Sequence, residues 1–403
     1  MTSSLLGVVI VAVLFGGALI VAALLLRHRK RVVALIVLVI LGTGSTIAAV
    51  QALHAQDPLH DLRWSDDNPA WSPDGREIVF SSNRTDPAGH LNSIYVMKSD
   101  GTGVRRLTRG RHDARYPSFS PDGRRIVYVA DLVGSDNYYT GRGEVHVVRA
   151  DGSHNILLST VGDISTESVP PAWSPDGRLI AFRSHKLDCL CVIAPNGNGL
   201  RRIASGWTFA WEPDGRSIAY EGEDEQVHTV QIASGETALL THNNRRPPLH
   251  TQRFEIPSIA WSPNGRQVAY VRGQRFINNA FIGPETSYGA GQAFVVDASG
   301  RREHRVGSPP NGDDGGFTAR WLPGVAGGLL LDGPDGIYLV PSRGGRQPLS
   351  ADGCCPIPSP DGKGLLLVRF GPFPNDSSTQ QTTAIFFAAI GGHSPMMLTQ
   401  KDR

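Results

Sequence analysis

The residues of this 403-residue chain that could support chemistry are four cysteines in two close pairs, Cys189-x-Cys191 and Cys354-Cys355. Thiols at these spacings can stay free, pair locally as disulfides, or bind a metal through sulfur. Zinc sites are usually completed by further cysteines or histidines, and no histidine stands at ligand spacing beside either pair. Free thiols and local disulfides both remain open, a metal site is disfavoured, and we predict no cofactor.

Signatures of catalysis are otherwise absent from the sequence. It contains no Gly-x-Ser-x-Gly elbow, no His-Glu-x-x-His pair and no glycine-rich phosphate loop. The net charge is +2 and 19% of residues are charged, a balance that favours no nucleic-acid partner. These observations favour a binding protein over an enzyme.

A sequence motif close to Ala-Trp-Ser-Pro-Asp-Gly-Arg recurs seven times. This repeat predicts the secondary structure that positions these residues. Its aromatic position is occupied, in order, by Trp71, Phe119, Trp173, Trp211, Trp261, Trp321 and, in a degraded last copy, Pro358. The steps between these positions are 48, 54, 38, 50, 60 and 37 residues. Propeller blades repeat about every 40–50 residues, so the chain is predicted to be all-β, with a seven-bladed β-propeller over residues 67–403. A six-bladed ring is the alternative.

Each repeat predicts four short strands. The Ser-Pro-Asp-Gly run suits a tight turn, because proline presets φ and glycine accepts a left-handed conformation. The strand after it carries apolar residues on both faces, such as Ile78, Val79 and Phe80, as expected of a sheet packed between two others. We predict that the repeated aromatic residues pack between neighbouring blades; ligand stacking is the alternative.

The repeated phrase resembles the WD-like repeats of TolB-like propellers, which also occur in prolyl oligopeptidase and tricorn relatives. This resemblance covers residues 67–403 and implies the fold. The sequence departs from TolB itself, because it lacks the small α/β domain before that propeller and has seven candidate blades where TolB has six. It therefore implies no role in the Tol system and transfers no binding residue. It also implies no peptidase activity, because no hydrolase domain accompanies the repeats.

The N-terminal segment predicts a membrane anchor. Residues 5–26 and 32–53 are each 22 positions without a charge, which is long enough to span a bilayer as a helix. The basic link 27–31 places the loop of this hairpin, residues 1–53, in the cytoplasm. A linker over 54–66 then leads to an extracytoplasmic propeller. The alternative is a secretory signal that is cleaved near Ala55, and it also predicts a propeller outside the cytoplasm.

Binding is predicted on the face that carries the long connections, because long loops on a rigid scaffold are the usual place for recognition. These connections span residues 81–93, 130–143, 241–256, 272–291 and 370–383. The aromatic and basic residues expected to contact a ligand there are Tyr138, Tyr139, Arg245, Arg246, His250, Arg253, Arg275, Phe276 and Tyr288. The alternative is that these loops plug the funnel or stay unstructured.

The function predicted from the sequence is a membrane-anchored, extracytoplasmic, non-catalytic propeller that binds a protein, peptide or envelope glycan. The alternative is a metal-dependent lyase or hydrolase acting on polysaccharide, because some seven-bladed propellers hold a metal through axial histidines. Two histidines, His146 and His228, fall on equivalent third strands where Tyr95 stands in the first repeat. We expect packing or hydrogen-bonding roles for them, since third strands lie away from the axis.

Overall fold

The computed structural model divides the chain into two compact units, residues 1–62 with 374–376 and residues 63–373 with 377–403. The described residues are 64–399, apart from gaps at 87–90, 111, 134–138, 159–169, 185, 243–251, 279–284, 289–290, 307–317, 325–327, 334–335, 342–344, 351–353, 371–382 and 392–394. The predicted spans 5–26 and 32–53, with their link, lie outside this part of the chain. Within it, no helix has the length and hydropathy needed to cross a membrane.

The described strands form seven antiparallel sheets, which confirms the seven-bladed propeller. Blades one to four are β1 (Asp66–Trp71), β2 (Glu77–Ser82), β3 (Ser93–Lys98), β4 (Arg105–Arg106); β5 (His112–Phe119), β6 (Arg125–Val133), β7 (Tyr139–Arg149), β8 (Ile156–Leu157); β9 (Ala172–Trp173), β10 (Ile180–Ser184), β11 (Cys189–Ile193), β12 (Arg201–Ala204); and β13 (Gly206–Trp211), β14 (Ser217–Gly222), β15 (Val227–Gln231), β16 (Thr237–Leu239).

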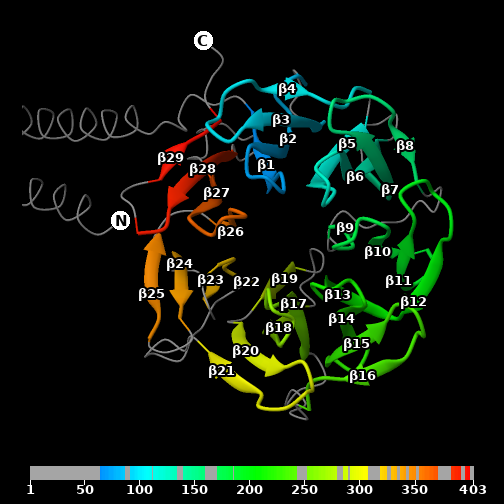
Figure 1. Ribbon diagram of the computed structural model, residues 1–403, viewed down its shortest axis with the longest axis vertical. Coiled ribbons are helices and arrows are strands. Elements are labelled where there is room, and N and C mark those ends of the chain that lie inside the picture. The colour runs from blue at the N-terminus through cyan, green and yellow to red at the C-terminus, as the bar shows by residue number, and fades with distance from the viewer. Residues whose placement is uncertain are drawn as a thin grey trace, which may run out of the picture. The chain divides into compact units, whose positions relative to one another are not determined.

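Blades five to seven follow the same order, with one added strand. They are β17 (Gln252–Trp261), β18 (Gln267–Asn278), β20 (Gln292–Asp297), β21 (His304–Val306), with β19 (Glu285–Tyr288) paired to β18; β22 (Thr318–Trp321), β23 (Leu329–Gly333), β24 (Gly336–Val340), β25 (Gln347–Ser350); and β26 (Cys354–Pro358), β27 (Gly364–Phe370), β28 (Thr383–Ala389), β29 (Met396–Met397). The first strand of each blade is the innermost, so seven strand edges surround the axis (Figure 1).

The turn between the first two strands has the left-handed glycine that its sequence predicts, and hydrogen bonds of its serine hold it together. In blade one, the Ser72 hydroxyl donates to Asp74 Oδ1 at 2.7 Å and accepts from the amide of Glu77 at 2.9 Å. The Gly75 amide donates to the Ser72 carbonyl at 2.9 Å with φ of 70°. The same bonds recur in blades two, three, five and seven, with asparagine replacing aspartate in blade five.

The repeated tryptophans pack between blades, as predicted, and most of them also form a hydrogen bond that the sequence does not reveal. The indole N–H of Trp71, Trp173, Trp211 and Trp321 donates to a carbonyl in the first strand of the preceding blade, at 3.0 to 3.3 Å. Trp261 is the exception, because its buried Nε1 has no partner among the described residues. The indole hydrogen bond therefore adds to blade-to-blade packing at four of the seven junctions.

The ring closes without a shared sheet, because blades one and seven are each built from consecutive strands. Trp71 donates to the Ile357 carbonyl and meets the Phe387 ring edge-on, with the ring centroids 6.2 Å apart. A pocket of about 510 Å³ lies at this junction, lined in part by Trp71, Asp74, Lys363 and Phe387. Side-chain packing and hydrogen bonds, rather than a shared sheet, therefore join the first blade to the last in the described structure.

Replacement of Gly362 by alanine is predicted to destabilise the propeller strongly. Gly362 has φ of 69°, and an added Cβ would lie 2.0 Å from the Pro323 carbonyl oxygen of blade six. The matched control is Gly199→Ala, where φ is 68° and nothing lies within 4 Å of the added Cβ. The control should cost about 1–2 kcal/mol from backbone strain alone, and Gly362→Ala clearly more. Urea unfolding of the full chain in detergent measures both; equal losses would contradict the packing argument.

Replacement of Trp321 by phenylalanine is predicted to destabilise the protein more than Trp261→Phe. Trp261 is the more deeply buried of the two, so the lost area does not favour this order, but only the Trp321 indole donates a hydrogen bond in the described structure, to the Ala260 carbonyl at 3.0 Å. Trp261→Phe instead removes a buried donor that has no partner in the described structure. The difference should be about 1 kcal/mol, measured by circular dichroism during urea unfolding. An equal or larger loss for Trp261→Phe would show that the bond contributes nothing.

Candidate functional site

Of the nine residues predicted to contact a ligand, four lie outside the described part of the chain: Tyr138, Arg245, Arg246 and His250. The backbone of the others is placed in strands: Tyr139 begins β7, and Arg253, Arg275, Phe276 and Tyr288 lie in β17, β18 and β19. Arg253 is directly opposite Arg275 in the register, and Arg275 is opposite Tyr288. The structure thus brings three of the predicted positions into one row across adjacent strands.

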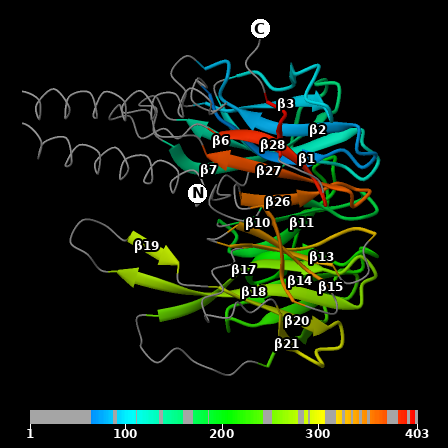
Figure 2. The same cartoon turned by 90° about the vertical axis from the view of Figure 1, so that its left-hand side faces the viewer.

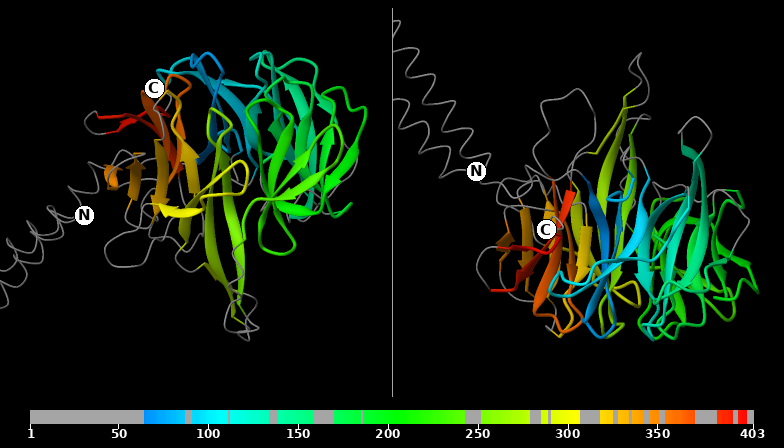
Figure 3. Two further views of the ribbon diagram at one scale, coloured as in Figure 1. Left: turned by 60° about the horizontal axis from the view of Figure 1, so that its bottom comes forward. Right: turned by 90° about the horizontal axis from the view of Figure 1, so that it is seen from above.

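The prediction of long loops was wrong for part of this face, where the chain forms strands instead. The connection expected over 272–291 contains the end of β18 and the whole of β19, and β17 begins inside the connection expected over 241–256. These segments pair with one another, which satisfies backbone groups that a loop would leave to water. The β18–β19 pair projects beyond the ring on the same side as the outer ends of β6 and β7 (Figures 2 and 3).

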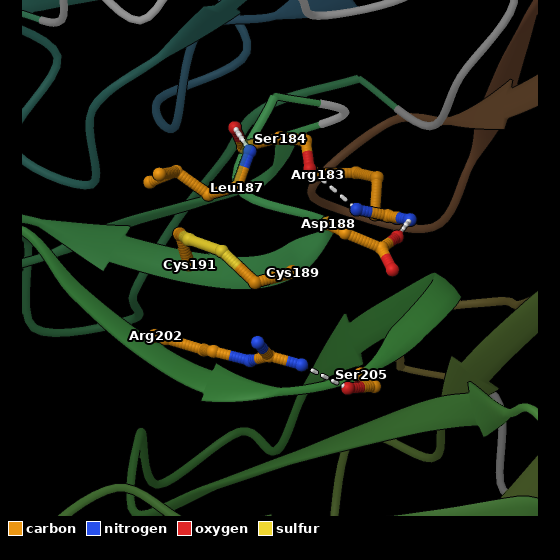
Figure 4. Close-up of a disulfide and its surroundings, with 8 residues drawn as sticks. All are labelled: Arg183, Ser184, Leu187, Asp188, Cys189, Cys191, Arg202 and Ser205. Atoms are coloured by element: carbon orange, nitrogen blue, oxygen red, sulfur yellow. Dashed lines mark hydrogen bonds and ion pairs between the residues drawn. A yellow bond between two sulfur atoms is a disulfide. The ribbon is translucent and has the colours of Figure 1, made fainter.

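The first cysteine pair forms a local disulfide, one of the two outcomes left open. Cys189 and Cys191 are bonded along β11 with Cα atoms 5.6 Å apart, and both are fully buried (Figure 4). The neighbouring Arg183 is also buried, pairs with Asp188 at 2.5 Å, and stacks on Trp207 of the next blade at 4.6 Å. The disulfide is enclosed, so its role is structural.

The second cysteine pair belongs to a backbone feature that sequence analysis missed. In three adjacent blades the innermost strand contains a β-bulge followed by proline, at Asn68-Pro69, Tyr116-Pro117 and Cys355-Pro356. The residue before each proline has a left-handed φ, of 49°, 55° and 59° respectively. Proline cannot donate to a sheet, so it is tolerated at an edge or in a bulge. The recurrence of proline two residues before the aromatic position is the signal that could have revealed this bulge.

Each bulge presents two consecutive, partly exposed residues on the innermost strand, and their chemistry differs between blades. These residues are Asp67 and Asn68 in blade one, Arg115 and Tyr116 in blade two, and Cys354 and Cys355 in blade seven. In a regular strand, consecutive side chains point to opposite faces of the sheet. The bulge removes this restriction, and we take these three pairs, called the bulge site below, as the candidate functional site.

Buried charged groups surround the bulge site in blades one and two. Asp66 is fully buried and accepts two hydrogen bonds from Arg84 Nη2, at 2.8 and 2.9 Å. Asp113 is buried and accepts from both the amide and the side chain of Asn92 of blade one, each at 2.8 Å, and from Arg115. These carboxylates are therefore paired, and they hold the bulges of neighbouring blades in place.

The carboxyl of Asp67 lies in a setting that disfavours its charge. Burial raises its pKa, and repulsion from Asp66 and Asp113 acts in the same direction, whereas Arg115 and a hydrogen bond involving Thr383 oppose the shift. Charged groups from blades one and two are thus close enough to influence one another. Such a cluster suits a ligand that forms hydrogen bonds.

In blade seven the two thiols of the bulge site contact each other. The Sγ atoms of Cys354 and Cys355 are 2.7 Å apart, and both cysteines are free. The Cys355 amide donates to Asp332 Oδ2 of blade six at 3.0 Å, and Asp332 Oδ1 accepts from the Thr318 amide at 2.7 Å. A hydrogen bond from Cys354 lowers the pKa of Cys355, as does nearby Arg320, and the same bond together with burial raises the pKa of Cys354.

The third-strand histidines have packing roles, as expected. His146 stacks on Tyr128 and His228 on Tyr220, with ring centroids 5.3 and 5.6 Å apart. His146 contacts Glu144 at 3.3 Å, and burial lowers its pKa. Among the residues placed by the structure, no three His, Cys, Asp or Glu side chains form a group suited to a metal ion.

Comparison with known proteins identifies relatives by fold. No family model matches the chain. An uncharacterised protein of Agrobacterium fabrum is 34% identical over 118 residues, which covers 29% of this chain and 39% of that relative. The chain therefore spans well under half the length of the curated relative that it matches.

Solved structures that resemble the chain include several β-propellers. A protein assigned as TolB from Agrobacterium tumefaciens is 16% identical over 60% of this chain and 79% of its own, with a TM-score of 0.39. Oligogalacturonate lyase in complex with manganese is 13% identical over 80% and 88%, with a TM-score of 0.52. The oligogalacturonate lyase of Vibrio parahaemolyticus is 12% identical over 79% and 88%, with a TM-score of 0.50. At these identities the likeness concerns the fold alone.

The variants Asp67→Asn and Asp74→Asn are predicted to change stability with opposite signs. The pKa of Asp67 is raised in the folded protein, so its ionised form opposes folding, and Asp67→Asn should become stabilising as pH rises above the ordinary value of 3.8. The pKa of Asp74 is lowered, first by its hydrogen bond from Ser72, so its ionised form favours folding. Asp74→Asn should therefore destabilise at neutral pH, and this loss should shrink as pH falls below 3.8.

Urea unfolding midpoints of the two variants and the parent, measured between pH 3 and pH 7, test both signs at once. A gain for Asp67→Asn that is equally large at both ends of this range would contradict the charge argument. It would show that the amide contributes a new contact instead.

Proposed function

We propose that this protein is a membrane-anchored propeller on the extracytoplasmic side, which binds a protein, peptide or envelope glycan without catalysis. The ring supplies a rigid frame, because each blade is fixed to its neighbours by buried side chains. The observation that carries the proposal is the β18–β19 pair, which projects from this frame together with β6 and β7. Recognition elements on a rigid scaffold are a common arrangement for binding.

Strand lengths support recognition on this side of the ring. Strands β6, β7, β17 and β18 contain 9, 11, 10 and 12 residues, whereas β2, β3 and β14 contain 6 each. The core needs only the shorter length, so the additional residues serve another purpose. Arg253 and Arg275 lie in these additional residues, and Tyr288 lies in β19 opposite Arg275; arginine and tyrosine are frequent anchors of binding surfaces.

Export is supported by the chemistry of the chain. The uncharged segments 5–26 and 32–53 have the length of membrane spans, and the basic link 27–31 favours an orientation with the propeller outside the cytoplasm. The Cys189–Cys191 disulfide suits an oxidising compartment. Membrane attachment and location are thus argued from these segments and the disulfide, not from the β18–β19 pair, and the same experiment tests them. The likeness to lyases is limited to fold, and no contact described above favours a catalytic role.

A photocrosslinking amino acid placed at Arg275 in the full-length chain tests the proposal in intact cells. Irradiation should join the protein to one dominant partner, recovered with membranes after an alkaline carbonate wash. The matched control is the same probe at Asn196, in an exposed turn between β11 and β12 on the opposite face. Equal products from both positions, or none specific to position 275, would refute recognition through the β18–β19 pair. Loss of the protein from washed membranes would refute the anchor.

A further inference from the structure

We propose that Cys354 and Cys355 are a redox-active dithiol, which closes reversibly to a vicinal disulfide by exchange with a disulfide-bonded oxidant. This site is separate from the β18–β19 pair. A redox role for these cysteines does not depend on the proposed binding function.

The bulge of blade seven brings the two thiols together. In a regular strand, Cys354 and Cys355 would point to opposite faces of the sheet. Here φ of Cys355 is 59°, the register shifts between Cys354 and Ile357, and the Sγ atoms are 2.7 Å apart. The thiols thus already face each other, so bond formation needs only a small further movement.

Neighbouring residues fix the bulge in this conformation, and the thiol of Cys355 stays exposed to solvent. Asp332 accepts the Cys355 amide at 3.0 Å, which fixes the left-handed residue against blade six. Cys355 is exposed and Cys354 is half-buried, so one thiol can meet an incoming molecule while the other lies behind it. The pKa of Cys355 is lowered, first by the hydrogen bond from Cys354 and also by the charge of Arg320, which is exposed as well; burial and the negative charge of Asp332 oppose this shift. An accessible thiolate with a resolving thiol beside it is the arrangement that exchange requires.

The reaction balances as an ordinary thiol–disulfide exchange. The Cys355 thiolate attacks one sulfur of the incoming disulfide, forms a mixed disulfide and releases the first thiol. The Cys354 thiol then loses its proton and attacks Cys355 Sγ, which forms the Cys354–Cys355 bond and releases the second thiol. Two electrons pass from the dithiol to the oxidant, and the two protons of the dithiol end on the released thiols.

Closure is expected to be reversible because the two cysteines are adjacent. Their Cα atoms are held about 3.8 Å apart by the trans peptide, below the separation of roughly 4.4–6.8 Å that disulfides usually adopt. A bond formed under this restraint is readily reduced. The Cys189–Cys191 disulfide differs, because it is fully buried and inaccessible to an exchanging thiol. It therefore serves as an internal control.

The test is a redox titration of the full-length protein in detergent. The chain is equilibrated in glutathione buffers of graded composition, free thiols are blocked with a maleimide, and tryptic peptides are weighed by mass spectrometry. The peptide 347–363, which contains Cys354 and Cys355, should carry two maleimide groups in reducing buffer. In oxidising buffer it should carry none and weigh two hydrogens less than the unmodified dithiol peptide. The separate peptide 187–201, which contains Cys189 and Cys191, should remain disulfide-bonded throughout.

Single variants test the assigned order of attack. Cys354→Ser leaves the exposed thiol and should accumulate the mixed disulfide with glutathione, because no resolving thiol remains. Cys355→Ser leaves the half-buried thiol and should acquire glutathione roughly tenfold more slowly. Blocked thiols at every buffer composition, a closed bond that survives the most reducing buffer, or the reverse order of reactivity in the two variants would each overturn the proposal.

Discussion

The contact between neighbouring blades is the interaction on which the rest of the structure depends. Each sheet has an apolar second strand that is buried on both faces, so no blade can hide its core alone. Five of the seven first strands end in a tryptophan that fills this contact, and the indole donates to the preceding blade at four of these junctions. Because the first and last blades share no strand, side-chain contacts close the ring, among them the edge-on contact of Trp71 with Phe387 and the hydrogen bond from Trp71 to the Ile357 carbonyl.

This arrangement leaves the innermost strands less constrained than the others. Each has a hydrogen-bonded partner on one side only, because its other edge faces the axis. Proline and a left-handed residue can therefore enter the strand without breaking the sheet. Blades seven, one and two have a left-handed residue before proline at the same position of this strand. The side chains there are two cysteines in blade seven, an aspartate and an asparagine in blade one, and an arginine and a tyrosine in blade two. A repeated backbone device thus presents different chemistry in adjacent blades.

The cysteines show how far sequence reasoning reaches. Their spacing limited them to free thiols or local pairs, and the structure contains one of each: a bonded pair at Cys189 and Cys191 and a free pair at Cys354 and Cys355. Spacing could not reveal that the first pair is enclosed while the second is exposed beside Asp332 and Arg320. The residues predicted to contact a ligand had the same limitation. Their register depends on pairing between segments that the sequence alone suggested to be loops.

The repeat determined the fold by itself: turn chemistry, strand alternation and the aromatic position recur at blade spacing, and all are local properties that a single chain displays. Blade number, strand order and the inter-blade role of tryptophan followed from them. Tertiary structure alone decided the indole hydrogen bonds, the extension of β17, β18 and β19, and the meeting of charged and thiol groups at the bulges. These depend on contacts between residues far apart in the chain, whose distances and burial no local pattern encodes.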